Sequence, residues 1–331
     1  MTGCFFQIDQ QSWQRVVACG LNASIAYLVL ACGTGRDNRT TAWSVNSIEK
    51  YTGIGRTMAK QAIDALEKIG AVTRVEGAKP LYRIEPPSNE VTGEVLEPRW
   101  IWLPNTLVTG AMGEPSPIER VRRLQDVMVL EHLISLYDIQ DLAENGGIWW
   151  RYIRRSYTRT RITERGIWNI WGFDRGSDGV WPNTPVIAIF ERDFAGRLGR
   201  KEIFEKFWAS WNALTKIGLI ECIPHLVEAD NNEAVIVYPC PSEADHGTQE
   251  ERALGELARS HAVRLLGDFM ENQVDAYEVA VPVPDNFPAV ELVGVFRLRY
   301  RPHTRKTAAW YAKSQNEAWR KRLGGDVQHQ G

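Results

Sequence analysis

The stretch that most constrains the fold begins at Ser44. Ser44 is a good N-cap for a short helix that ends near Tyr51, and Gly53 supplies a tight turn after it. A second helix is expected from about Gly55, because apolar residues recur there at helical spacing. They form one stripe made of Ala59, Ala62, Ile63, Leu66 and Ile69. The spacing predicts two helices joined by a glycine turn, which is a helix-turn-helix arrangement.

A β-hairpin is expected directly after the second helix. Gly70 ends that helix, residues 71–75 and 81–84 have strand character, and residues 76–80 form the turn between them. The hairpin would therefore lie beside the second helix as a wing.

The solvent face of the second helix is polar and basic near its N-terminal end, where a recognition helix meets base edges in the major groove. Its side chains carry donors and acceptors that suit guanine and phosphate oxygens. The alternative is an ordinary solvated helix face, since any such face is polar. The DNA-contacting residues predicted for this region are Ser44, Asn46, Arg56, Thr57, Lys60, Gln61, Arg74 and Lys79.

Residues 22–86 resemble a known class of domain. Residues 26–33 (Ala-Tyr-Leu-Val-Leu-Ala-Cys-Gly), the loop 35–44 and the helix-turn-helix are similar to the winged helix-turn-helix domains of plasmid and phage replication proteins and transcription regulators. Trp43-Ser44 lacks the proline usual in that family, and Gly55 stands where the family usually has a serine cap. The resemblance implies sequence-specific binding of double-stranded DNA, for replication or for transcription regulation.

Residues 27–35 also permit a second interpretation, because a strand followed by Gly33-Thr34-Gly35 is similar to the methyl-donor loop of methyltransferases. An enzyme of that class needs an acidic residue at the end of the next strand, to bind the ribose. The residues about 20 positions downstream instead belong to the helix that begins at Ser44. This reading is therefore disfavoured.

Composition limits the remaining possibilities. The chain has 331 residues, 44% of them hydrophobic, and a net charge of −2, so two or three domains are expected and any nucleic-acid contact must come from local basic patches. Its five cysteines are dispersed and form no Cys-x-x-Cys pair, so neither a disulfide framework nor a zinc site is expected. The longest apolar run, 25–32, is too short for a membrane span. We expect a cytoplasmic protein with no metal or cofactor.

The predicted fold class is α+β. Residues 1–86 form the expected winged-helix DNA-binding domain, and residues 87–117 a linker with a short strand. Residues 118–241 are expected to begin with one long helix, to contain an inserted basic hairpin, and to form a second winged-helix-like module. Residues 242–331 are expected to form a C-terminal α/β element of strands and helix with a basic tail.

The second module is predicted from an internal repeat. Residues 65–72 (Ala-Leu-Glu-Lys-Ile-Gly-Ala-Val) recur as residues 213–220 (Ala-Leu-Thr-Lys-Ile-Gly-Leu-Ile). The groove-facing positions of the first unit become Phe204, Glu205, Trp208 and Ala209 in the second, so this module is expected to be degenerate and not to read DNA. Its aromatic helix, residues 204–211, is expected to contact a second copy or a protein partner, or else to form core.

Two further segments are basic. Residues 148–166 hold six arginines against one glutamate, and strand alternation puts Arg155, Arg159 and Arg161 on one face with Tyr157. Basic groups interleaved with aromatics suit a phosphate track, so these three arginines are predicted to contact DNA. Residues 297–323 hold nine Lys/Arg against one Glu, and strand alternation puts Arg297, Arg299 and Arg301 on one face. Solvated faces are the alternative for both segments. The phosphate-contacting residues predicted in the second segment are Arg297, Arg299, Arg301, Lys306, Lys313 and Arg320.

No catalytic constellation stands out, so we expect a non-enzymatic protein. Glu191 and Asp193 leave a metal-dependent nuclease as a minor alternative. The predicted function is sequence-specific double-stranded DNA binding in a plasmid or phage, as a replication initiator or transcription regulator. The alternative from another class is an assembly component that uses winged helices for docking.

Overall fold

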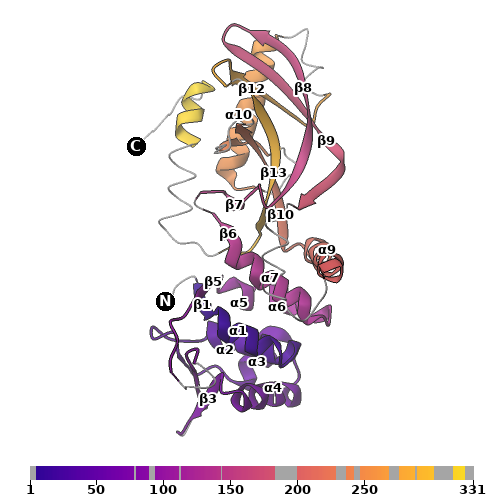
Figure 1. Cartoon of the computed structure of the whole chain (residues 1–331). Coiled ribbons are helices and arrows are strands. Elements are labelled where there is room, and N and C mark those ends of the chain that lie inside the picture. Colours follow the sequence, from indigo (N-terminus) through magenta and orange to yellow (C-terminus); the bar gives the residue numbers. More distant parts are fainter. Residues whose placement is uncertain are drawn as a thin grey trace, which may run out of the picture. The chain divides into compact units, whose positions relative to one another are not determined.

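The chain folds into two compact units, each built from several segments (Figure 1). Unit 1 comprises Met1–Ile139, Phe190–Leu219 and Leu298–Thr304, and unit 2 comprises Gln140–Ile189, Ile220–Arg297 and Arg305–Gly331. The computed structural model describes residues 5–77, 80–88, 94–111, 113–142, 144–182, 200–228, 236–241, 247–267, 276–287, 289–301 and 316–324. Helices and strands are mixed throughout, so the α+β class is confirmed. The expected boundaries near residues 86, 117 and 241 do not coincide with those of the units.

Unit 1 is mainly helical and is organised around α2. That helix is apolar on all sides, and its residues from Ala23 to Cys32 are all buried, as expected for a central helix. In chain order the elements are β1 (Phe5–Asp9), α1 (Gln10–Val17), α2 (Leu21–Cys32), β2 (Thr40–Thr41), α3 (Val45–Thr52), α4 (Arg56–Lys68), β3 (Val72–Val75), β4 (Leu81–Ile84), β5 (Trp100–Pro104), α5 (Thr106–Thr109), α6 (Pro117–Arg123), α7 (Val127–Ile139) and α9 (Arg200–Lys216).

The two predicted helices and the hairpin after them are confirmed. Ser44 and Ser47 form a capping box at the start of α3, and Gly53 ends α3 with a left-handed φ of 67°. Helix α4 buries four of the five predicted stripe residues inside unit 1: Ala59, Ala62, Ile63 and Leu66. Strands β3 and β4 pair antiparallel, and β2 extends them to a three-stranded sheet in the order β2-β4-β3.

The internal repeat encodes the same helix ending twice. In the first copy the Gly70 N–H donates to the Glu67 carbonyl and the Ala71 N–H to the Leu66 carbonyl. The equivalent Gly218 and Leu219 bonds recur in the second copy, and both glycines have φ near +70°, at 67° and 71°. This is a Schellman cap, in which the left-handed residue is normally glycine. The eight-residue likeness is thus explained by one local motif.

The expectation of a second winged-helix-like module is wrong, because its parts belong to different units. Helix α9 lies in unit 1, whereas β10 (Ile220–Glu228) and β11 (Ile236–Pro239) belong to a six-stranded sheet in unit 2. The single long helix expected over residues 118–143 is also two helices. Gln125 has a positive φ of 56° between α6 and α7, and the Asp126 carboxylate accepts a hydrogen bond from the Met128 N–H at 2.8 Å at the start of α7.

Side chains from α6 and α7 hold the two later segments of unit 1 in place. The Arg120 Nη1 donates to the Ile217 carbonyl at 3.0 Å, just after α9, and the Tyr137 hydroxyl donates to the Tyr300 carbonyl at 2.7 Å. Arg120 also donates to the Tyr300 hydroxyl at 2.5 Å. Helix α9 itself packs against α7. Unit 1 is therefore completed by residues far from its N-terminal part in the sequence.

Unit 2 is a twisted six-stranded sheet with α10 packed against β11 and β12 (Figure 1). Its strands lie in the order β11-β10-β13-β8-β9-β12, and Trp319, on a short helix over residues 316–322, contacts Tyr238 in its core. The remaining elements are β6 (Gln140–Asp141), β7 (Gly147–Ile148), β8 (Ile153–Arg165), β9 (Trp168–Pro182), α10 (Gln249–Leu266), β12 (Val279–Pro284) and β13 (Val290–Leu298). The predicted basic hairpin corresponds to β8–β9. None of the helices in the described ranges has both the length and the apolar character that a membrane crossing requires.

Candidate nucleic-acid interface

An open hollow of about 930 Å³ lies beside the N-terminal half of α4. Arg56 and Lys60 reach it from α4, because residues four apart share one helix face. Arg74 reaches it from β3, and Ser44 and Asn46 from the start of α3. The α3–α4 turn and the hairpin thus bring together five of the eight residues that were predicted for this region.

Contacts at the hollow arrange its basic groups. The Arg56 Nη1 donates to the Asn46 Oδ1 at 3.2 Å, which ties the start of α4 to α3. Arg74 forms an ion pair with Glu67 at 3.3 Å, with its side chain still 59% exposed. Lys60 is exposed and makes no ion pair within the part of the chain that the structure describes. Two of the three cations, Arg56 and Lys60, thus face the hollow without a carboxylate partner among the residues that the structure describes.

Two carboxylates at the same hollow, Asp64 and Glu76, were not among the predicted site residues. Asp64 lies four positions after Lys60, so helical spacing could have identified it. A carboxylate there would repel a phosphate but can accept a hydrogen bond from the amino group of cytosine. The hollow therefore combines groups of both signs instead of being a uniform basic patch.

Two of the other predicted residues of this region, Thr57 and Gln61, do not line the hollow. Thr57 and Gln61 are exposed on α4, and Gln61 lines a separate hollow of about 530 Å³ beside Met58 and the start of α2. The turn of the helix by about 100° per residue separates them from Arg56 and Lys60. Lys79 lies outside the described residues.

The arginines of the β8–β9 hairpin contact aromatic rings in unit 2. The Arg159 guanidinium lies 4.6 Å from the centre of the Trp171 ring, and the Arg161 guanidinium lies 5.8 Å from the same ring. Arg155 lies 5.9 Å from the ring of Phe296. The ladder is irregular between Arg155 and Tyr157 and again after Arg161, so the strict alternation that was expected along the strand is interrupted.

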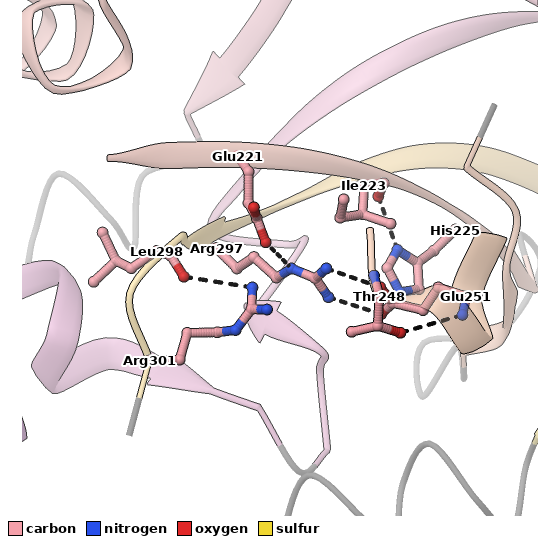
Figure 2. Close-up of polar contacts among 8 residues, drawn as sticks. All are labelled: Glu221, Ile223, His225, Thr248, Glu251, Arg297, Leu298 and Arg301. Carbon is pink, nitrogen blue, oxygen red and sulfur yellow. Dashed lines mark hydrogen bonds and ion pairs between the residues drawn. The ribbon is translucent and has the colours of Figure 1, made fainter. Parts of the chain in front are cut away.

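The prediction that Arg297 contacts phosphate is wrong, because this residue is buried. Its side chain is buried in unit 2 between Glu221 on β10 and Glu251 on α10, as Figure 2 shows. The Nε lies 2.6 Å from Glu221, and the two Nη atoms lie 2.7 and 2.8 Å from the Glu251 carboxylate. A guanidinium enclosed in this way cannot contact a phosphate. The prediction failed because β13 is buried on both faces, so strand alternation gives it no solvent face.

Arg299 and Arg301 follow β13, which ends at Leu298, so they do not share a strand face with Arg297. Arg299 is 43% exposed and lies 3.4 Å from Glu114. Arg301 donates to the Leu298 carbonyl at 3.5 Å. In unit 2, Arg320 donates to the Glu250 carbonyl at 3.5 Å. Lys306 and Lys313 lie outside the described residues, as do Glu191 and Asp193.

Charge and burial shift the pKa values of the buried cluster in unit 2. Burial opposes ionisation of Glu251, but the hydrogen bonds and charge of Arg297 outweigh it and lower the Glu251 pKa to about 2. Burial lowers the pKa of His225 to about 4, so this histidine is neutral near pH 7. The cluster is thus a fixed ionic group inside unit 2, and sequence spacing gave no signal for it.

The aromatic helix α9 is divided between core and surface. Phe207 and Trp211 are buried within unit 1, whereas Phe204 is 42% exposed and contacts Trp208 edge-to-face, with ring centres 6.2 Å apart.

Comparison of the chain with protein-family models, curated proteins and solved structures finds no match. The geometry of the sites is therefore the basis on which a function can be assigned to this chain.

Proposed function

We propose that unit 1 binds double-stranded DNA in a sequence-specific way, with α4 as the recognition helix of a winged helix-turn-helix. The observation that supports this most is the shared hollow of Arg56, Lys60 and Arg74 between α4 and the hairpin. A recognition helix contacts base edges with residues near its N-terminal end, and Arg56 and Lys60 occupy its first two turns.

The groups at the hollow suit both parts of DNA recognition. Lys60 and Arg56 can donate to guanine O6 and N7, Asp64 can accept from a cytosine amino group, and Arg74 on the hairpin can contact a phosphate. A mixed set of donors and acceptors favours base reading over general attraction to the backbone, because phosphates reward positive charge alone. We further propose that the protein serves replication or transcription regulation in a plasmid or phage, in the cytoplasm, as the resemblance of residues 22–86 suggests.

The test is selection of bound fragments from fragmented DNA by the purified full chain, followed by affinity measurements on an enriched fragment. Lys60→Ala should weaken specific binding by about 1–3 kcal/mol. The matched control is Lys68→Ala, which removes the same charge from an exposed position in the last turn of α4, away from the hollow. Equal losses from the two variants, or no enrichment of any fragment by the wild-type protein, would contradict the proposal.

A second candidate function is docking in a protein assembly through α9. The exposed Phe204 beside Trp208 is the observation that favours it, because large exposed aromatics are common in protein interfaces. Phe204→Ser should then lower self-association or partner capture without loss of DNA binding. Sedimentation of the wild-type protein and of the Phe204→Ser variant over a range of concentrations tests self-association.

A further inference from the structure

We propose that unit 2 binds single-stranded nucleic acid along the β8–β9 hairpin, at the Arg159–Trp171–Arg161 cluster. The three side chains come from paired strands, since Arg161 lies opposite Trp171 and Arg159 opposite Phe173. Arg159 and Arg161 are exposed, and Trp171 is partly buried against the core of unit 2. Both guanidinium groups lie within cation–π distance of this one indole.

The charges of the hairpin leave room for phosphates. Within the described residues, Arg155, Arg159 and Arg165 form no ion pair with a carboxylate. Arg159 instead donates to the Val290 carbonyl, which fixes its direction without neutralising it. Carboxylates also lie on or beside the hairpin: Glu164 pairs with Arg161, Glu278 with Arg175 and Glu291 with Arg154, Asp174 accepts from the Glu278 N–H, and Asp285 lies at the hairpin tip, where its N–H donates to the Ile167 carbonyl. On β8 itself five arginines stand against Glu164 alone, so the excess of positive charge lies on that strand.

Apolar surface at the same place indicates unpaired bases. Ile167 at the tip of the hairpin is 61% exposed, and its carbonyl is held by the Asp285 N–H at 2.8 Å. Bases in a duplex have their faces stacked on one another, so only an unpaired base can cover an indole or an isoleucine. Stacking platforms interleaved with arginines are the usual way of binding single strands without sequence preference.

The dimensions of the cluster also suit a short single strand. The distance along β8 from Arg155 to Arg161 is about 20 Å at roughly 3.3 Å per residue. Such a length accommodates a few nucleotides, near the lower end of the site sizes of about 4–16 nucleotides found in single-strand-binding folds. This site is separate from the hollow beside α4, so it does not depend on the function proposed for unit 1.

The test uses the full chain and labelled homopolymers of about 16 nucleotides, with oligothymidylate, oligouridylate and a duplex of equal length measured by fluorescence anisotropy. The double variant Arg159→Gln/Arg161→Gln should lower affinity for the single strand about tenfold or more. It should also flatten the slope of log affinity against log salt by about 1.4, because each single-strand phosphate contributes roughly 0.7. The relative affinity for the two homopolymers then identifies the strand as DNA or RNA.

The matched control is Arg175→Gln on β9, whose arginine pairs with Glu278 at 2.6 Å and should contribute little. Trp171→Leu keeps an apolar side chain in the core but removes the aromatic face, and it should weaken binding while near-ultraviolet circular dichroism shows a folded sheet. Lys68→Ala, at an exposed position away from both sites, should leave binding of the homopolymers unchanged. Wild-type binding by the double arginine variant, or equal losses in Arg175→Gln, would overturn the proposal.

Discussion

Arg297 and Glu251 form a two-pronged ion pair inside unit 2, with both Nη atoms of the guanidinium within 2.8 Å of the two carboxylate oxygens. The same carboxylate accepts a hydrogen bond from the Thr248 N–H at 2.8 Å, where it completes the capping box of α10. One glutamate thus connects the start of α10 to the end of β13. Because charged hydrogen bonds of this paired kind are strong and directional, the connection fixes the helix on the sheet.

We expect Arg297→Ala to lower the free energy of unfolding by about 3–5 kcal/mol, because it leaves Glu221 and Glu251 buried without their cation. Urea denaturation followed by tryptophan fluorescence measures the change. The control is Arg123→Ala, which breaks an exposed pair with Glu119 and should cost less than about 1 kcal/mol. Similar losses from both variants would show that the buried cluster contributes no more than a surface pair.

Stability should fall as the solution is acidified below neutral pH. Burial lowers the pKa of His225 to about 4 and that of His132 to about 3, both below the unfolded value of about 6.5. The unfolded chain therefore binds more protons in this range, so the stabilisation is complete above about pH 6.5 and decreases toward pH 4. Glu251, with a pKa of about 2, adds a further loss below about pH 4.3.

Hydrogen exchange at several pH values measures this dependence for each unit separately. His225→Gln should flatten the pH dependence of stability measured for peptides from β10. The pH dependence of stability measured for peptides from α7 should stay unchanged. A slope for β10 that is the same in this variant as in the wild type would show that His225 does not carry the effect.

Asn46 should support DNA binding through Arg56, whose guanidinium it orients by the 3.2 Å hydrogen bond. We expect Asn46→Ala to weaken specific DNA binding by about 0.5–1.5 kcal/mol, the usual contribution of one hydrogen bond. The loss should vanish when Arg56 is already alanine, which a double-mutant cycle of measured affinities reveals. Gln61→Ala is the control, since Gln61 lines the other hollow. Additive losses at Asn46 and Arg56 would mean that Asn46 contacts DNA directly.

Two glycines should respond to substitution in opposite ways. Alanine in a helix interior is normally better than glycine by about 1 kcal/mol, but a Cβ on Gly255 in α10 would lie 2.6 Å from the Pro241 carbonyl oxygen. We expect Gly255→Ala to destabilise by about 1–3 kcal/mol. Gly55→Ser should instead stabilise by a few tenths of a kcal/mol, because its backbone is extended and the added hydroxyl can cap α4. Thermal unfolding of both variants provides the measurement.

The elements that the sequence predicted are those specified by local signals. Ser44, Gly53 and Gly70 each act within one turn of chain, so α3, α4 and the hairpin were identified almost to the residue. The assignment of α9 and β10 to different units depends on which distant strands pair. No local pattern carries that information, and the repeated helix ending at Gly218 instead favoured a repeated module.

Only part of the candidate site could likewise be predicted from the sequence. Helical spacing placed Arg56 and Lys60 together, and the hairpin brought in Arg74. The presence of Glu76 at the hollow follows from how the hairpin packs beside α4, whereas the separation of Gln61 from Arg56 and Lys60 follows from the rotation of the helix by about 100° per residue. In unit 2, strand alternation suggested a solvent face for Arg297 because it cannot show that a strand lies inside a sheet.

The three-part construction of unit 1 has a consequence for how the protein is made. Tyr300, whose carbonyl accepts from Tyr137 and whose hydroxyl accepts from Arg120, is synthesised after two of the three segments of unit 2. Translation proceeds from the N-terminus, so the helices around α2 must wait on the ribosome for their last contacts while the sheet of unit 2 emerges. A nonsense mutation anywhere before this tyrosine would therefore damage both units. Because each unit is made of three separate segments, no single continuous stretch of the gene encodes either unit.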